Sequence, residues 1–306
     1  MITVEECLNN KNGNYPLHYA CEKGAPLNVV KYLVEEAYGD KGRVLLGKAD
    51  NDGSYPLHLA CYGGALDAIK YLVEEDGDKG KELLGKADKY GIYPLHYACK
   101  NGASLDVIKY LVEEADGDKG KEPLGKADDY GYYPLHYACS NGASLDVIKY
   151  LVEEADGDKG KDLLGKADNC GNYPLHLACK NDASLDVIKY LVEEAHGDKG
   201  KEPLGKADEN GNYPLHYACS NGASLDVIKY LVEEADGDKG KELLGKATKN
   251  GWYPLHWACC GGASLDVIKY LVEEVDDDKG KELLGKANIY GNYPLHLACS
   301  NDASLD

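Results

Sequence analysis

The feature that most constrains the fold is a tetrapeptide, Tyr-Pro-Leu-His, which recurs along the 306 residues at a nearly constant spacing. Successive histidines of this block lie 40 residues apart, with one interval of 38. The block histidines are His18, His58, His96, His136, His176, His216, His256 and His296. Such a period predicts a solenoid, in which each unit packs only on its neighbours. Although length alone suggests two domains, the repeats follow one another without a linker. We therefore expect residues 1–306 to form a single solenoid.

The repeats begin near residues 12, 50, 88, 128, 168, 208, 248 and 288, and the last one is incomplete. Residues 128–167 show what each repeat contains. Residues 128–131 predict a turn, since Asp128 can bond its own backbone and Gly131 supplies a positive φ. This turn and the residue that follows it, Tyr132, are called the tip. Pro134 suits a first helical position, so the apolar residues 135–139 predict a short helix A that ends at Asn141-Gly142.

A second, amphipathic helix, helix B, is predicted next, with Ser144 as its N-cap. Its predicted buried stripe consists of Leu145, Ile148, Leu151 and Val152, whose spacing places them on one face of a helix. Lys149 and Glu153, four residues apart, predict a modest ion pair on the solvent side. Neither helix can bury its apolar face alone, so the predicted fold class is all-α, a solenoid of helix–turn–helix repeats.

One stretch shows a family resemblance most clearly. Residues 168–179 read Asp-Asn-Cys-Gly-Asn-Tyr-Pro-Leu-His-Leu-Ala-Cys, and residues 185–192 read Leu-Asp-Val-Ile-Lys-Tyr-Leu-Val. This pattern resembles the ankyrin repeat, and the resemblance recurs in register over essentially the whole chain, in about 7.5 copies. It implies a stack of helix pairs whose loops project to one side. It also implies protein recognition on the concave face formed by those loops and helix A.

The sequence departs from the family at the start of helix A. Tyrosine stands where the family has threonine before Pro-Leu-His, from Tyr15 to Tyr293. A threonine hydroxyl can cap the helix, whereas a phenol reaches too far for this, so the sequence leaves the cap geometry open.

The repeat is also longer than the usual ankyrin unit of about 33 residues. One extra residue is the serine before helix B, which the second repeat lacks at Ala65-Leu66, and the others follow helix B. There we expect a buried leucine to anchor an exposed loop or short helical turn. It is present in every copy as Leu46, Leu84, Leu124, Leu164, Leu204, Leu244 and Leu284. The array stops at Asp306, before the eighth helix B, so we expect the chain to be a fragment without a polar capping repeat.

Several patterns suggest chemistry but lack an essential part. Residues 120–126 match G-x-x-x-x-G-K, yet Ala127 follows where a phosphate loop needs Ser or Thr. The acid-rich residues 116–122 lack the third acid, the sixth-position glycine and the final glutamate of an EF-hand. The block histidines have no second metal ligand within their repeat, so we expect each to bond a neighbouring loop. The simplest interpretation of His196 is that it is an exposed loop residue.

The cysteines that follow alanine in helix A occupy a position at which a small side chain is expected. We expect them to be buried, unreactive thiols. They are Cys21, Cys61, Cys99, Cys139, Cys179, Cys219, Cys259 and Cys299. A nucleophile would need a base within reach, and every copy cannot be an active site. We therefore expect no enzyme activity, no cofactor and no metal.

Composition narrows the partner. The net charge of −19 and the pI of ≈ 4.9 argue against nucleic acid and anionic membranes and fit a basic protein partner. The alternative is that the acidic surface serves solubility alone. Residues 1–7 lack the features of a secretory signal, and no apolar run approaches the ~18 residues of a membrane span. We expect an intracellular monomer, cytoplasmic or nuclear, with its 11 cysteines reduced.

Comparison of the repeats with one another locates the candidate binding surface. From the third repeat on, helix B scarcely varies, whereas the tips and the residue after each block histidine change. By resemblance these positions lie on the concave face, and aromatic residues there are of the types enriched in binding hot spots. The predicted partner-binding residues are Tyr97, Tyr132, Tyr137, Tyr217, Trp252 and Trp257. The alternative is drift on a solvated surface.

These observations favour an interaction module that binds a protein on its concave face. Two alternatives stay open. The chain could instead be a regulatory ankyrin segment of a larger protein whose enzyme or channel domain is absent. More distantly, its acidic loops could bind cations.

Overall fold

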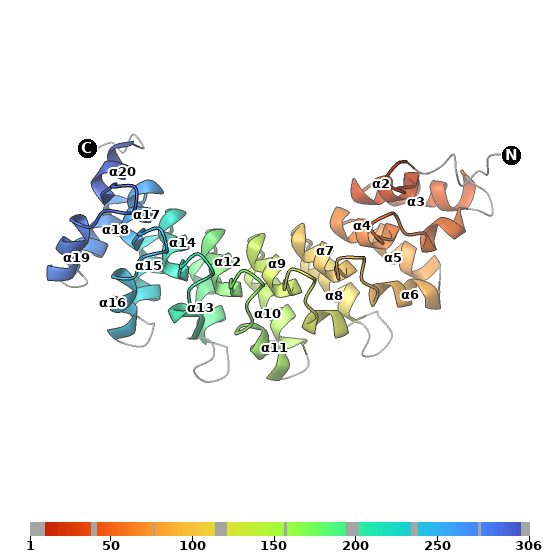
Figure 1. The fold of residues 1–306 in the computed structure, drawn as a ribbon. Coiled ribbons are helices and arrows are strands. Elements are labelled where there is room, and N and C mark those ends of the chain that lie inside the picture. The colour runs from red at the N-terminus through yellow and green to blue at the C-terminus, as the bar shows by residue number, and fades with distance from the viewer. Residues whose placement is uncertain are drawn as a thin grey trace. The chain divides into compact units, whose positions relative to one another are not determined.

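A computed structural model describes residues 10–37, 42–75, 77–113, 121–155, 158–193, 202–233, 238–274 and 277–300. They belong to two compact units, Met1–Gly160 and Lys161–Asp306, and each unit is a stack of helix pairs (Figure 1). Within these ranges there are helices and turns but no β-strand, which confirms the expected all-α repeat fold. That the two units make one continuous solenoid stays a prediction. Residues 1–7, most of the acid-rich run 116–122, His196 and the end of the chain from 301 lie outside the described ranges.

In the first unit, helix A of successive repeats is α2 (Pro16–Glu22), α4 (Pro56–Gly63), α7 (Pro94–Lys100) and α9 (Pro134–Ser140). Helix B is α3 (Leu27–Lys31), continued by the π-helical turn η1 (Tyr32–Glu36), then α5 (Leu66–Glu75), α8 (Leu105–Glu113) and α10 (Leu145–Glu153). The connecting segments contain η3 (Arg43–Gly47), α6 (Asp78–Leu84) and η5 (Glu122–Gly125). The division between the units falls within α11 (Asp158–Leu163).

In the second unit, helix A is α12 (Pro174–Lys180), α14 (Pro214–Ser220), α17 (Pro254–Cys260) and α20 (Pro294–Ser300). Helix B is α13 (Leu185–Glu193), α15 (Leu225–Glu233) and α18 (Leu265–Lys269), the last continued by the π-helical turn η8 (Tyr270–Glu274). The connecting segments contain η7 (Glu202–Gly205), α16 (Asp238–Leu244) and α19 (Asp277–Leu284). Within each unit, every helix A packs against the next helix A, and helices B form a second row.

The start of helix A is capped by histidine, which resolves the geometry that the sequence left open. In α14 the backbone N–H of Tyr213 donates to Nδ1 of His216 at 3.1 Å, and the backbone N–H of His216 donates to the Tyr213 carbonyl at 2.9 Å. The phenol of Tyr213 makes no cap bond. Its ring instead stacks on the imidazole, with centroids 5.6 Å apart. Proline at the first helical position then costs no hydrogen bond.

Helix B buries nearly the stripe that the sequence predicts. In α10, Ile148, Leu151 and Val152 are at most 1% exposed. The prediction is wrong at its first member, because Leu145 is only half-buried, and it missed Val147, which is buried. Ser144 does precede the helix with an extended backbone, but its hydroxyl makes no capping bond.

The segment after helix B is a short helical turn held by its leucine, as expected. Leu84, Leu124 and Leu164 are buried, whereas Leu284 is only partly so. The preceding glycine lets this turn approach helix B closely. At Gly80 in α6, a Cβ atom would overlap the carbonyl oxygen of Val73 in α5.

Helices B are joined from one repeat to the next by a contact that the sequence analysis missed. In the second unit, the ammonium group of Lys229 lies 5.3 Å from the ring centroid of Tyr270, and the Tyr270 hydroxyl donates to Glu233 at 2.9 Å. Lys189, Tyr230 and Glu193 repeat the arrangement one step earlier. The lysine therefore faces a tyrosine of the next repeat, in addition to any pairing within its own helix. Only the arrangement of neighbouring repeats shows this.

Candidate functional site

Where a repeat begins with aspartate, its tip is a turn built around that one carboxylate. Oδ1 of Asp208 accepts hydrogen bonds from the backbone N–H groups of Asn210 and Asn212, both at 2.8 Å, and Gly211 has a φ of 83°. Asp88, Asp128 and Asp168 make the same pair of bonds. The predicted self-bonded aspartate and left-handed glycine are thus confirmed.

Successive tips are linked by main-chain hydrogen bonds. In the second unit, the N–H of Glu209 donates to the carbonyl of Cys170 at 2.9 Å, and the N–H of Lys249 donates to the carbonyl of Asn210 at 3.0 Å. The N–H of Ile289 donates in the same way to the carbonyl of Asn250 at 3.1 Å. Because these bonds fix the spacing of the tips, the backbone that carries the tip side chains is held in place.

The tyrosine that follows a block histidine bonds the tip of its own repeat. The phenols of Tyr97, Tyr137 and Tyr217 donate to Oδ2 of Asp88, Asp128 and Asp208 at 2.9, 2.6 and 2.6 Å. Burial alone would raise the pKa of Asp208, but the hydrogen bonds from Tyr217 and Asn212 outweigh it and lower that pKa. The pKa of Tyr217 is raised by burial and by the same bond. These three predicted site residues therefore also hold the tip in place.

All six predicted binding residues are partly exposed. In the first unit, Tyr132 lies against Tyr137, with ring centroids 5.0 Å apart. In the second, Trp252 lies against Trp257 at 4.5 Å. Among the other variable positions, Ile92 and Leu177 are buried at 6% and 3% exposed, so variation there does not mark an open surface.

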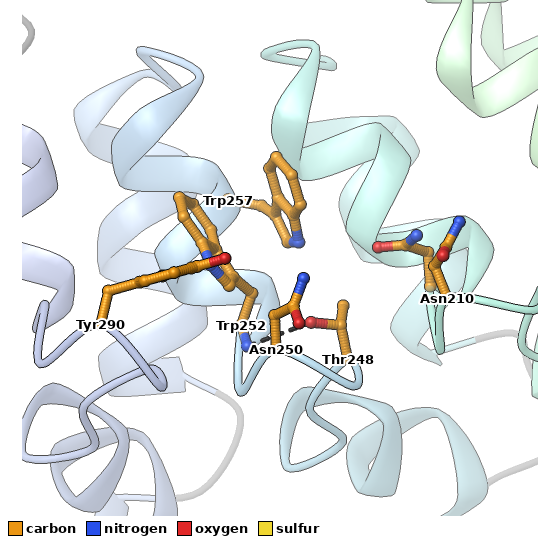
Figure 2. A pocket seen from close by; sticks show the side chains of 7 residues that line it. Asn210, Thr248, Asn250, Trp252, Trp257 and Tyr290 are labelled. Atoms are coloured by element: carbon orange, nitrogen blue, oxygen red, sulfur yellow. Dashed lines mark hydrogen bonds between the residues drawn. The ribbon is translucent and has the colours of Figure 1, made fainter.

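The tryptophan pair borders a hollow of about 370 Å³ in the second unit. Its walls come from three successive tips and from α17. They are Asn210, Asn212, Thr248, Asn250, Trp252, Trp257 and Tyr290. Figure 2 shows the aromatic side chains on one side of the hollow and Asn210 across from them, with Thr248 and Asn250 between. No lining side chain is acidic or basic, although the chain as a whole carries a charge of −19.

The hollow exists where the tip carboxylate is missing. Thr248 stands in the place of the tip aspartate, and its hydroxyl accepts only the N–H of Trp252, at 3.1 Å, among the bonds the structure describes. Trp257 stands in the place of the tyrosine that would donate to that aspartate. Its indole Nε1 is buried and has no hydrogen-bond partner. A buried donor without an acceptor costs roughly 1–3 kcal/mol, so this atom favours a ligand that supplies one.

The block histidines bond neighbouring loops, as expected from the sequence. Nε2 of His176 lies 3.1 Å from the carbonyl oxygen of Lys206, and Nε2 of His216 lies 3.1 Å from that of Lys246. Since Nδ1 accepts the cap bond, Nε2 carries the proton of the neutral ring. Burial lowers the pKa of both rings to about 4. They are structural groups, held uncharged. His296 is exposed and makes only the cap bond with Tyr293 within the described residues.

The helix-A cysteines are buried thiols, with one exception. Burial raises the pKa of Cys21 to about 12 and that of Cys259 to about 11, so the reactive thiolate is disfavoured. The expectation is wrong for Cys299, which is exposed because no helix of the described residues covers the far side of α20. In the part of the chain that the structure describes, no three His, Cys, Asp or Glu side chains are grouped as metal ligands would be.

A family model of ankyrin repeats, built on three copies, matches residues 2–82, 78–161, 157–241 and 238–305. The chain belongs to the ankyrin repeat family. No curated protein matched the sequence. Ankyrin repeats serve in general as modules for protein interaction. None of the helices in the described ranges combines the length and apolar character needed to cross a bilayer.

Proposed function

We propose that this ankyrin protein is a non-catalytic module that binds a partner protein through its tip face. The tip face comprises the tips and the residues that follow the block histidines. Its contact residues are Tyr97, Tyr132, Tyr137, Tyr217, Trp252 and Trp257. The observation that carries the proposal is the hollow beside Trp252 and Trp257, with its buried, unpartnered indole donor.

The tip face suits binding for two further reasons. Within each unit its frame is fixed by hydrogen bonds between tips, so few backbone and side-chain groups have to become ordered when a partner docks. Tyrosine and tryptophan supply large contact areas with few rotatable bonds, and such side chains dominate many interfaces. The net charge of −19 favours a partner that is basic around the contact. We propose that the module acts as a monomer inside the cell.

The test begins with selection of peptide ligands for the intact chain from a random displayed library. The ligands are then titrated against Trp252→Ala and Trp257→Ala at two salt concentrations. Truncating a hot-spot residue costs at least about 2 kcal/mol, so we expect an affinity loss of about 30-fold, and slower association at the higher salt. Thermal unfolding of each variant separates lost contacts from lost structure.

The matched control is Tyr32→Ala. Tyr32 is an aromatic residue of η1 that is 55% exposed and lies outside the tip face. Its truncation is expected to leave ligand affinity unchanged. If the tryptophan variants melt early but bind every selected ligand as well as the native chain does, these side chains are core residues and the proposed site is wrong.

A further inference from the structure

We propose that the hollow bordered by Trp252 and Trp257 binds a proline-rich segment of the partner in the polyproline II conformation. This inference rests on the proposed function and names the chemistry of its ligand. It starts from the indole Nε1 of Trp257, which is buried without an acceptor. A ligand that places an oxygen at this atom removes that desolvation cost.

The remaining polar groups of the hollow are three side-chain amides and the hydroxyl groups of Thr248 and Tyr290. Asn212 is oriented by Asp208, because its side-chain N–H group donates to Oδ2 of Asp208 at 3.1 Å, which leaves its amide oxygen for other contacts. The side chains of Asn210 and Asn250 also line the hollow, and each can donate and accept. With Trp257 they form a set of neutral donors. Such donors match main-chain carbonyl oxygens.

The absence of charge in the lining restricts the ligand. A carboxylate or ammonium group would lose its hydration in the hollow without meeting an opposite charge, which is costly. In the preceding repeat the equivalent position holds Asp208, whose carboxylate already accepts from Tyr217 and Asn212. Thr248 in its place removes the charge. The hollow therefore favours an uncharged stretch of chain, while charged residues of the partner lie outside it.

The aromatic walls favour proline within that stretch. Trp252 and Trp257 lie at 37° with centroids 4.5 Å apart, and Tyr290 from the next tip is 67% exposed (Figure 2). Polyproline II chains make no internal hydrogen bonds, so their carbonyl oxygens are free to accept from such donors. Proline has no N–H that would need an acceptor. Aromatic-lined grooves bind this pre-formed conformation at a low entropic cost.

Ligand binding at this site can be followed through tryptophan signals alone, because Trp252 and Trp257 are the only two tryptophans of the sequence. The probe is a blocked decaproline peptide, added to the ¹⁵N-labelled protein while the two indole N–H signals are followed by NMR. Trp252→Phe assigns the signals. We expect the Trp257 signal to shift and saturate with decaproline, and to stay in place with a blocked Gly-Ser peptide of equal length.

Two variants test the hydrogen bonds. Trp257→Phe keeps an aromatic ring but removes the donor, and Asn250→Ala removes an amide at the surface of the hollow. Each is expected to weaken decaproline binding about three- to tenfold, the size of one lost hydrogen bond. For Trp257→Phe, intrinsic fluorescence of Trp252 and circular dichroism follow binding and folding. The matched control is Tyr32→Phe in η1 of the first unit, outside the tip face, which is expected to bind decaproline as the native chain does.

The inference is overturned if decaproline leaves both indole signals in place, or if the Gly-Ser peptide moves them equally. It is also overturned if an uncharged oligosaccharide shifts the Trp257 signal where decaproline does not. Failure here is distinct from failure of the proposed function. If library ligands lack proline but still require Trp252 and Trp257 for binding, the proline-rich ligand is wrong, whereas the proposed binding face is supported.

Discussion

At the scale of single residues, the block histidines couple the stability of the stack to pH. In the repeats of His58, His96, His176 and His216, Nδ1 of the ring accepts the cap bond and Nε2 donates to a carbonyl oxygen, so the ring holds one proton only. Burial lowers the pKa to about 4 in four repeats. These are His58, His96, His176 and His216. An unfolded histidine takes up its proton near pH 6.5.

Stability should therefore fall as the pH drops below about 6.5. Between that value and about 4 the unfolded chain binds more protons than the native one, so protonation favours unfolding. The expected loss is on the order of 1 kcal/mol per histidine for each pH unit, with no change from these groups above pH 7. Urea unfolding followed by circular dichroism at pH 7.5, 6.0 and 5.0 measures this. The prediction is contradicted if the free energy of unfolding changes over this range by no more than the titration of carboxyl groups explains.

Some residue roles could be predicted from the sequence because they depend on near neighbours. The aspartate and glycine of a tip belong to one turn, and the lack of a second metal ligand near each block histidine already favoured a bond to a neighbouring loop. The cap bond at Nδ1 could not be foreseen, since it requires the imidazole to fold back over its own helix. Nor could the free donor of Trp257. It follows from two changes nine residues apart, at 248 and 257, which are connected only if the phenol at this place is known to reach the tip.

At the scale of elements, the connecting segment adapts to its sequence while keeping its leucine buried. It is 3₁₀-helical in the copies that contain Pro123 and Pro203, since proline cannot continue an α-helical hydrogen-bond pattern. It is α-helical in α6, α16 and α19, which have leucine there. The turn η3 is 3₁₀-helical without proline, so proline is not the only cause. The sequence predicted the buried anchor but could not choose between the two helical forms.

A glycine in this segment is expected to resist replacement. Alanine normally favours a helix over glycine, yet Gly80→Ala would drive a methyl group into the Val73 carbonyl. We expect a loss of about 1–3 kcal/mol, the usual cost of overpacking, seen as a lower melting temperature. Gly47→Ala is the control, because a Cβ atom there meets nothing within 4 Å. Equal melting temperatures for the two variants would show that the segment simply moves aside.

At the scale of the whole molecule, each repeat is stabilised by the neighbours on which it packs. The sequence predicted this from its period alone, because a helix pair of this length cannot bury its apolar face by itself. The effect is visible by comparing equivalent leucines in the second unit. Leu255 of α17, which has a helix A on both sides, is 1% exposed, whereas Leu295 of α20 is 57% exposed.

Protection against hydrogen exchange should follow the same rule. Helix α20 is expected to open by local unfolding, with amide protection at least about tenfold lower than in α17, because opening it breaks the packing against one neighbouring helix A rather than two. The two helices share the sequence Pro-Leu-His, so the comparison holds the cap constant. Exchange followed by mass spectrometry on peptides covering 254–260 and 294–300 measures the difference. Equal protection would mean that a contact outside the described residues covers α20, and that nearest-neighbour packing alone does not set the stability of this end.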